Sequence, residues 1–145
     1  MTGNPEPMSE KKKIFIVDDH PVLRDGLSEM FNRTSELRVC GEASTGEEAL
    51  KRIPSAAPDL VVVDLSLPVL GGVNAVRSLF SRYPGSRVIV LSVHDEQPAL
   101  AQALGAGAAG FVLKRTAAVD LTEAVDAVLR GETYVSAVPG RRPGP

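Results

Sequence analysis

The stretch LVVVD at residues 60–64 is an unbroken apolar run that ends in a carboxylate. The stretch VIVLS at residues 88–92 repeats the pattern and ends in a hydroxyl. Strands with one face in water alternate apolar and polar residues, whereas strands covered on both faces read as continuous apolar runs. Both stretches are therefore predicted to be central strands of a parallel sheet with helices on either side.

Three further apolar runs, of which the one around Leu37 is the weakest, bring the number of predicted strands to five. The strands are expected at residues 14–17, 37–40, 60–63, 88–91 and 111–113, with the second at a sheet edge. Apolar residues at helical spacing fill the segments between them. Pro21, the pair Thr45 and Glu48, and Gly131 are typical of helix ends. The alternation predicts an α/β fold of the (βα)5 type, a doubly wound parallel sheet.

Composition indicates one globular domain. The chain has 145 residues, 43% apolar and 23% charged, with a formal net charge of −2 and one cysteine. That charge argues against direct nucleic-acid binding, and a single cysteine fits a reducing cytoplasm. No apolar stretch reaches the length of a membrane span, so no membrane partner is expected. We expect a domain at residues 12–131, a disordered tail at 1–11 and a linker or truncated tail at 132–145, with Met1 and Met8 both candidate start residues.

Ionisable or hydroxyl side chains stand where four of the predicted strands end. Asp18 and Asp19 follow the first strand, Asp64 the third, Ser92 the fourth and Lys114 the fifth. The carboxyl ends of parallel strands share one rim of a sheet, so we expect these side chains to converge. Crowded carboxylates repel one another, and Mg²⁺ relieves this with carboxylate and phosphate oxygens as ligands. Asp64, on a central strand, is the best candidate for a carboxylate that accepts a phosphoryl group.

Four motifs together resemble the receiver domain of two-component response regulators, over roughly residues 12–131. They are IFIVDDH at 14–20, VVDLSLP at 62–68 followed by Gly71 and Gly72, VLS at 90–92, and GFVLK at 110–114. Each motif alone is weak, but their joint order and spacing are specific. The resemblance implies the flavodoxin-like or CheY-like strand order 2-1-3-4-5.

The resemblance also implies a role for each residue at the rim. Asp64 would accept a phosphoryl group from a sensor histidine kinase in a reaction that needs Mg²⁺. Asp19 would bind the metal directly and Asp18 would help, with Asp64 and the backbone carbonyl of Ser66 completing the site. Lys114 would pair with Asp64 and then with the phosphoryl oxygens. The implied chemistry is limited to self-phosphorylation and self-dephosphorylation, so the chain is not expected to be an enzyme.

The resemblance also implies a conformational switch that responds to phosphorylation of Asp64. Ser92 would bind a phosphoryl oxygen, and Phe111 would swing inward behind it as the aromatic switch. The change would reach the fourth helix, the fifth strand and the fifth helix, a face expected to mediate homodimerisation on phosphorylation. Residues 105–114, with no proline after Lys114, resemble the NarL/FixJ class, whose LuxR-type helix-turn-helix output domain follows the receiver. We expect any regulation of transcription to act through such an output domain, which is missing from these residues.

Three other functions stay open at this point. A haloacid-dehalogenase-type phosphohydrolase also uses an aspartate nucleophile, Mg²⁺ and a lysine, but it needs Asp-x-Asp where this chain has Asp18, Asp19 and His20. A flavin-binding module would need a phosphate loop rich in Ser, Thr and Gly after the first strand. A degenerate receiver would act only as a protein-binding module, and the complete set of site residue types argues against it.

Some residues are interpreted as structural. The stretch GAGAAG at 105–110 has the spacing of a dinucleotide-binding loop, but such a loop follows a strand and precedes a helix. Here a predicted helix comes first, so the glycines are expected to shape a helix-to-strand connection. His20 and His94 are interpreted as exposed loop residues, and Cys40 as a small core residue.

Overall fold

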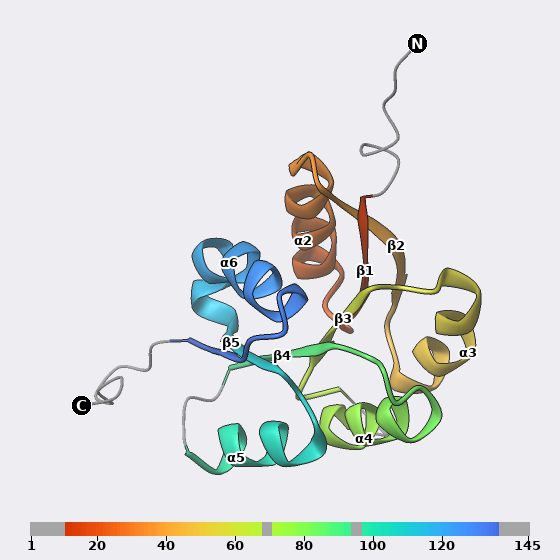
Figure 1. Cartoon of the computed structure of the whole chain (residues 1–145), viewed down its shortest axis with the longest axis vertical. Helices are drawn as coiled ribbons and strands as arrows, with labels where there is room; N and C mark the ends of the chain where they lie inside the picture. The colour runs from red at the N-terminus through yellow and green to blue at the C-terminus, as the bar shows by residue number, and fades with distance from the viewer. Residues whose placement is uncertain (1–10, 68–70, 94–96, 137–145) are drawn as a thin grey trace.

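A parallel sheet of six strands runs through the part of the chain that the computed structural model describes, residues 11–67, 71–93 and 97–136 (Figure 1). The strand order is β2-β1-β3-β4-β5-β6. The predicted order 2-1-3-4-5 is therefore confirmed, and β6 is an addition to it. The strands are β1 (Lys12–Val17), β2 (Leu37–Ala43), β3 (Leu60–Asp64), β4 (Val88–Ser92), β5 (Gly110–Leu113) and β6 (Tyr134–Val135).

Helices cover both faces of this sheet and make a three-layer sandwich (Figure 1). Two of them, α2 (Pro21–Arg33) and α6 (Ala117–Leu129), pack on one face. The other face is covered by α3 (Gly46–Ala56), α4 (Gly72–Arg82) and α5 (Gln97–Ala106). A 3₁₀ turn, η1 (Lys114–Thr116), joins β5 to α6. Within the described ranges, no helix is long and apolar enough to cross a membrane.

The central strands are buried on both sides, as their sequences predict. Every residue of β3 and of β4 is buried. In β1, Ile14 and Ile16 pack toward α2 and α6, whereas Phe15 and Val17 pack toward the other helical layer. Full burial of such a side chain stabilises the fold by about 1.5–3 kcal/mol. The strand ends that carry the polar residues are thus held by a core on each side.

The predicted helix-end signals appear in the structure. Pro21 lies in the first turn of α2, and the Oγ1 atom of Thr45 accepts a hydrogen bond from the Glu48 N–H at 3.0 Å. Glu48 in turn accepts from the N–H of Ser44 at 3.0 Å, one residue earlier than in a standard capping box. Gly131, with φ of +90°, ends α6.

The glycines of the stretch 105–110 shape the connection from α5 to β5, as expected. Gly107 has φ of +115°, and its N–H donates to the carbonyl of Leu104 at the end of α5. A Cβ atom at this position would lie 2.7 Å from the ring of Phe80 on α4. Both the backbone conformation and the close packing therefore require glycine here.

The sequence pattern did not predict β6, which lies in the segment expected to be a linker. Tyr134 and Val135 pair with Gly110 and Phe111, and the next residue, Ser136, is 1% exposed. The sheet therefore extends past residue 131, the residue at which the sequence pattern predicts the end of the domain. Residues 1–10 and 137–145 of the two expected tails lie outside the described residues.

Ser136 ties this last strand to β5 and α6. Its Oγ atom donates to Asp120 Oδ2 at 2.9 Å and accepts from the Leu113 N–H at 3.2 Å. Thr116 Oγ1 donates to the same carboxylate oxygen at 2.7 Å. Nearby, the pKa of Tyr134 is raised to about 12, mainly because its side chain is partly buried and further because Asp120 and Glu123 are negatively charged.

Replacing Ser136 with alanine is expected to lower the free energy of unfolding by about 1–3 kcal/mol. The reason is that the buried Leu113 N–H would lose its acceptor and Asp120 one of its donors. Urea denaturation measures the change. Ser81→Ala, at an exposed position of α4, is the matched control and should stay within about 0.5 kcal/mol of the original chain. Equal effects of the two changes would contradict a structural role for Ser136.

Candidate functional site

The four strands β1, β3, β4 and β5 end side by side, and their last residues bring polar groups to one rim of the sheet. Asp18 and Asp19 follow β1, Asp64 is the last residue of β3, and Ser92 is the last residue of β4. Lys114 follows β5 as the first residue of η1. Because these strands are parallel neighbours, the side chains predicted to converge do lie at the same rim.

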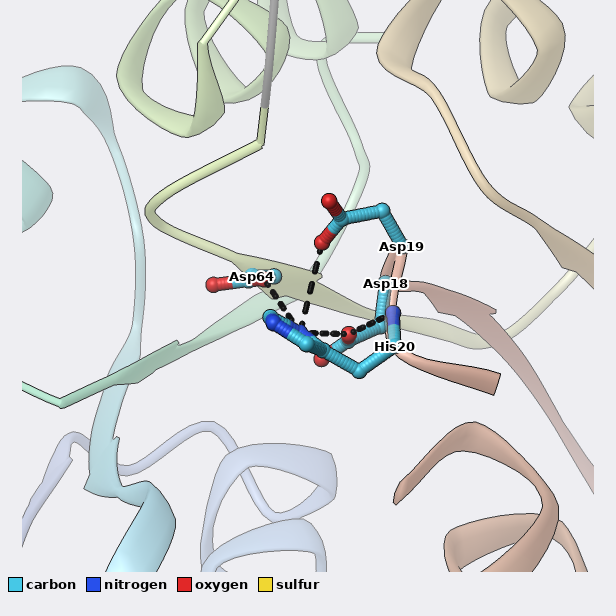
Figure 2. A group of neighbouring side chains, drawn as sticks. All are labelled: Asp18, Asp19, His20 and Asp64. Carbon is cyan, nitrogen blue, oxygen red and sulfur yellow. Dashed lines mark hydrogen bonds and ion pairs between the residues drawn. The ribbon is translucent and has the colours of Figure 1, made fainter. Parts of the chain in front are cut away.

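Three carboxylates form a cluster at this rim (Figure 2). Asp18 and Asp64 are fully buried, and the side chain of Asp19 is 35% exposed. One oxygen of each, together with a ring nitrogen of His20, lies within 4.8 Å of the others. The Oδ2 atom of Asp18 and the Oδ1 atom of Asp19 are buried and accept no hydrogen bond. Buried carboxylate oxygens without donors are ligands that suit a hard divalent cation such as Mg²⁺.

Lys114 forms ion pairs with both buried acids. Its Nζ atom lies 3.0 Å from Asp64 Oδ2 and 3.4 Å from Asp18 Oδ2, and its side chain is 11% exposed. The contact with Asp18 is an ion pair without hydrogen-bond geometry, so that oxygen still lacks a donor. One ammonium does not neutralise three carboxylates, and the cluster keeps a local field that attracts a further cation.

Ser66 holds the other oxygen of Asp64. Its N–H and its hydroxyl both donate to Asp64 Oδ1, at 3.0 Å and 2.9 Å. The sequence resemblance assigned only the backbone carbonyl of Ser66 a role and missed these two donors. The loop that carries them ends at Gly72, whose Cα lies so close to the Asp64 carbonyl and to Leu65 that no Cβ fits. The Asp64 carboxylate is thus held by Ser66 on one oxygen and by Lys114 on the other.

His20 was interpreted as an exposed loop residue, and that description is incomplete. The side chain is 58% exposed, yet its Nδ1 atom lies 3.0 Å from Asp18, 3.3 Å from Asp19 and 3.7 Å from Asp64 (Figure 2). Its backbone N–H also donates to Asp18 Oδ1 at 2.8 Å. The signal in the sequence was direct adjacency to two acidic residues. His94 lies outside the described residues.

Arg24 supports the loop after β1 from behind, a contact that sequence reasoning also missed. Its Nη1 atom donates to the backbone carbonyl of Asp18 at 2.7 Å, and its Nε atom donates to Glu42 on β2 at 3.1 Å. Ser28 on α2 donates to the second oxygen of Glu42 at 2.6 Å. This network holds the backbone of the loop that carries the carboxylates of Asp18 and Asp19.

The two residues expected to form the switch lie on the neighbouring strands β4 and β5, with Ser92 as the last residue of β4. Ser92 is 1% exposed and Phe111, on the neighbouring strand β5, is also 1% exposed, with its ring inside the core layer toward α5. A cavity of about 350 Å³ opens beside Ser92 between the starts of α4 and α5. Its lining residues are Leu65, Ser66, Val73, Ser92, Val93, Ala99 and Gln102. A cavity of about 430 Å³, beside Leu60 and Arg87, lies at the opposite ends of β3 and β4.

A family model for the response regulator receiver domain matches residues 14–126. The chain belongs to this family. Receiver domains typically bind Mg²⁺ in an acidic pocket, and the carboxylates of Asp18, Asp19 and Asp64 form such a pocket here.

Curated relatives of this receiver domain include regulators of transcription. The chain is 36% identical over 131 residues to the transcriptional regulatory protein DegU of Brevibacillus brevis, covering 90% of this chain and 56% of that protein. It is 40% identical over 123 residues to the DNA-binding transcriptional activator DevR/DosR of Mycobacterium tuberculosis, covering 85% and 57%. The receiver domain therefore spans about half the length of the curated relatives that it matches.

Solved structures place the fold in the same family. A LuxR-family two-component response regulator from Aurantimonas sp. superposes with a TM-score of 0.83 at 32% identity, covering 89% of this chain and 91% of the other. The signal receiver domain of a putative response regulator NarL from Mycobacterium tuberculosis gives 0.79 at 33% identity, covering 85% and 99%. The expected resemblance to LuxR-type response regulators is confirmed.

Proposed function

We propose that this receiver domain accepts a phosphoryl group from a sensor histidine kinase onto Asp64, in a Mg²⁺-dependent reaction in the cytoplasm. The observation that supports this most is the environment of the Asp64 carboxylate. It is fully buried at the end of a central strand, with Ser66 donating to one oxygen and Lys114 to the other. Family membership favours this function over a phosphohydrolase or a flavin-binding module.

The proposed transfer is a displacement at phosphorus. An Asp64 oxygen forms a bond to phosphorus while the bond from phosphorus to the donor's histidine nitrogen breaks, and that nitrogen keeps the electron pair. When bound, Mg²⁺ would supply positive charge to the phosphoryl oxygens as negative charge spreads over them. Asp18 and Asp19 would hold the metal together with Asp64 and the carbonyl of Ser66. The Lys114 ammonium, 3.0 Å from the acceptor, would move its hydrogen bond to a phosphoryl oxygen.

We propose that phosphorylation changes the conformation of the helices and strands next to Asp64. Ser92 would donate to a phosphoryl oxygen, and Phe111 would report the change to the face formed by α5, β5 and α6. We propose that this face mediates homodimerisation on phosphorylation. Since relatives of about twice this length are named as regulators of transcription, we also propose that DNA is reached through an output domain beyond these residues.

The test is the intact mass of the protein after incubation with acetyl phosphate, with Mg²⁺ and with a chelator in its place. We expect one phosphoryl group per chain in Mg²⁺ only, stable in acid and labile in base as an acyl phosphate is. Peptide mapping should place it on Asp64. If Mg²⁺ produced no adduct, the chain would instead be a degenerate receiver that acts only as a binding module.

A further inference from the structure

We propose that Arg24 is a positioning residue for the metal site, because it holds the peptide group that joins Asp18 to Asp19. The inference rests on the proposed function, since it concerns the Mg²⁺ that the transfer to Asp64 needs. It adds two side chains that do not belong to the acidic cluster, Arg24 and its partner Glu42. These two residues raise the affinity for the ion through the backbone that carries its ligands.

The Arg24 guanidinium binds the peptide group between the two carboxylates. Its Nη1 atom donates to the backbone carbonyl of Asp18 at 2.7 Å. A peptide group is planar, so a donor held on its oxygen restrains the torsion angles on either side, ψ of Asp18 and φ of Asp19. Those two angles set the direction of one carboxylate relative to the other. Figure 2 shows the two side chains leaving consecutive residues at the end of β1.

The backbone matters because the carboxylates have few other restraints. Among the described residues, none donates a hydrogen bond to the buried Oδ2 atom of Asp18 or the buried Oδ1 atom of Asp19. The Lys114 ammonium, 3.4 Å from Asp18 Oδ2, attracts this oxygen without hydrogen-bond geometry. The positions of both oxygens therefore depend on how the loop is held. Arg24 restrains its other end too, since its own N–H donates to the His20 carbonyl at 2.9 Å.

Glu42 and Ser28 hold the guanidinium in place. Arg24 Nε donates to Glu42 Oε1 at 3.1 Å, and the Ser28 hydroxyl donates to Glu42 Oε2 at 2.6 Å. The side chains of Arg24 and Glu42 are 19% and 34% exposed, so water shields the pair only in part. Glu42 belongs to β2, which pairs with β1. The arginine is therefore anchored to the sheet as well as to its own helix.

The sign of the effect separates positioning from simple electrostatics. A cation close to the site repels Mg²⁺, so loss of the Arg24 charge alone would raise the affinity for the ion. Loss of the hydrogen bond to Asp18 frees the peptide group and lowers the affinity instead. Groups that orient metal ligands typically contribute about 10–100-fold to metal affinity. Positioning is therefore expected to outweigh the repulsion, which the paired charge of Glu42 also reduces.

The experiment titrates the full chain with magnesium chloride and follows the backbone amide signals by NMR. In Arg24→Met the dissociation constant for Mg²⁺ should rise about tenfold or more. Arg24→Lys keeps the charge but cannot bridge Asp18 and Glu42 at once, so the constant should rise there too, by a smaller factor. Arg33→Met removes the same charge from an exposed position of the same helix and should change the constant by less than about twofold.

The Mg²⁺ dependence of phosphorylation by acetyl phosphate gives a second readout, which a general loss of stability would not reproduce. In Arg24→Met the Mg²⁺ concentration at half-maximal rate should rise by the same factor as the dissociation constant. The rate at saturating Mg²⁺ should change by less than about threefold, because Asp64 lies on another strand and is held by Ser66 and Lys114.

An unchanged or lower dissociation constant in Arg24→Met would overturn the proposal, as would an equal rise in Arg33→Met. A fall in the saturating rate without a shift in the half-maximal concentration would also overturn it. Urea denaturation shows whether each variant is folded under the assay conditions. Should Arg24→Met fail to fold, Arg24→Lys decides the question, and an unchanged constant there would count against positioning.

The outcome is separable from that of the proposed function. If the original chain forms the phosphoryl adduct but Arg24→Met binds Mg²⁺ with unchanged affinity, only the positioning role fails. If Arg24→Met binds Mg²⁺ more weakly but the original chain forms no adduct, only the proposed function fails.

Discussion

Asp64→Asn is expected to abolish the phosphoryl adduct entirely, since the acceptor oxygen is replaced by an amide that is not a nucleophile at neutral pH. The substitution keeps the shape of the side chain and one oxygen, so Ser66 retains its acceptor. Loss of the adduct would then reflect chemistry and not the loss of the surrounding fold. Intact mass after acetyl phosphate and Mg²⁺ gives the result directly.

Asp59→Asn is the matched control for this variant. Asp59 precedes the same strand that Asp64 ends, and its Oδ2 atom accepts from the Lys13 N–H at 2.7 Å, a contact that the oxygen of asparagine preserves. This variant should be phosphorylated as the original chain is. An adduct that persisted in Asp64→Asn would point to Asp18 or Asp19 as the nucleophile and would revive the phosphohydrolase interpretation.

Asp19→Asn is expected to raise the free energy of unfolding by about 1–2 kcal/mol when divalent cations are absent. The reason is that the Asp19 carboxylate lies close to the buried carboxylates of Asp18 and Asp64. One oxygen of each of the three lies within 4.8 Å of the others. Like charges at that distance repel by about 1 kcal/mol in water and by about 3 kcal/mol at an effective dielectric constant of 20. Partial exposure of Asp19 places the expected gain in the lower part of that range.

Mg²⁺ should reverse the order of stability of the two chains. The original chain gains stability by binding the ion, whereas Asp19→Asn binds it more weakly and gains less. Urea denaturation with and without Mg²⁺ measures both effects, and Asp25→Asn, at an exposed position of α2, should show neither. If Asp19→Asn were less stable than the original chain without Mg²⁺, repulsion would not be the dominant interaction in this cluster.

The sequence pattern predicted the sheet because positions buried on both faces of a strand are occupied by apolar residues. Residues of β3 and β4 are apolar on both faces, and such a run bounded by helical patterns is typical of a strand between two helical layers. Parallel pairing then brings Asp64, Ser92 and Lys114 to one rim, so their proximity followed from topology alone. Asp64 was chosen as the acceptor from its place on a central strand, whereas the roles of Ser92 and Lys114 in phosphoryl transfer came from the family resemblance; all three roles stay predictions.

The sequence pattern could not predict the direction in which individual side chains point. Nothing in the spacing of His20 shows that its ring turns back toward Asp18, because the rotation depends on the loop between β1 and α2. The two donors of Ser66 depend in the same way on the loop after β3. The strand β6 was missed for another reason: its two residues are too few to show any periodicity.

The short strand β6 bears on solubility as well as on folding. In and just after this strand, the N–H groups of Tyr134 and Ser136 donate to the carbonyls of Ala109, just before β5, and of Phe111 within it. A chain cut after Gly131 would leave that side of β5 open, and an open strand edge is a template on which other chains add their own strands. Preparations that end there are expected to aggregate as concentration rises, whereas those that continue through Ser136 keep the edge covered.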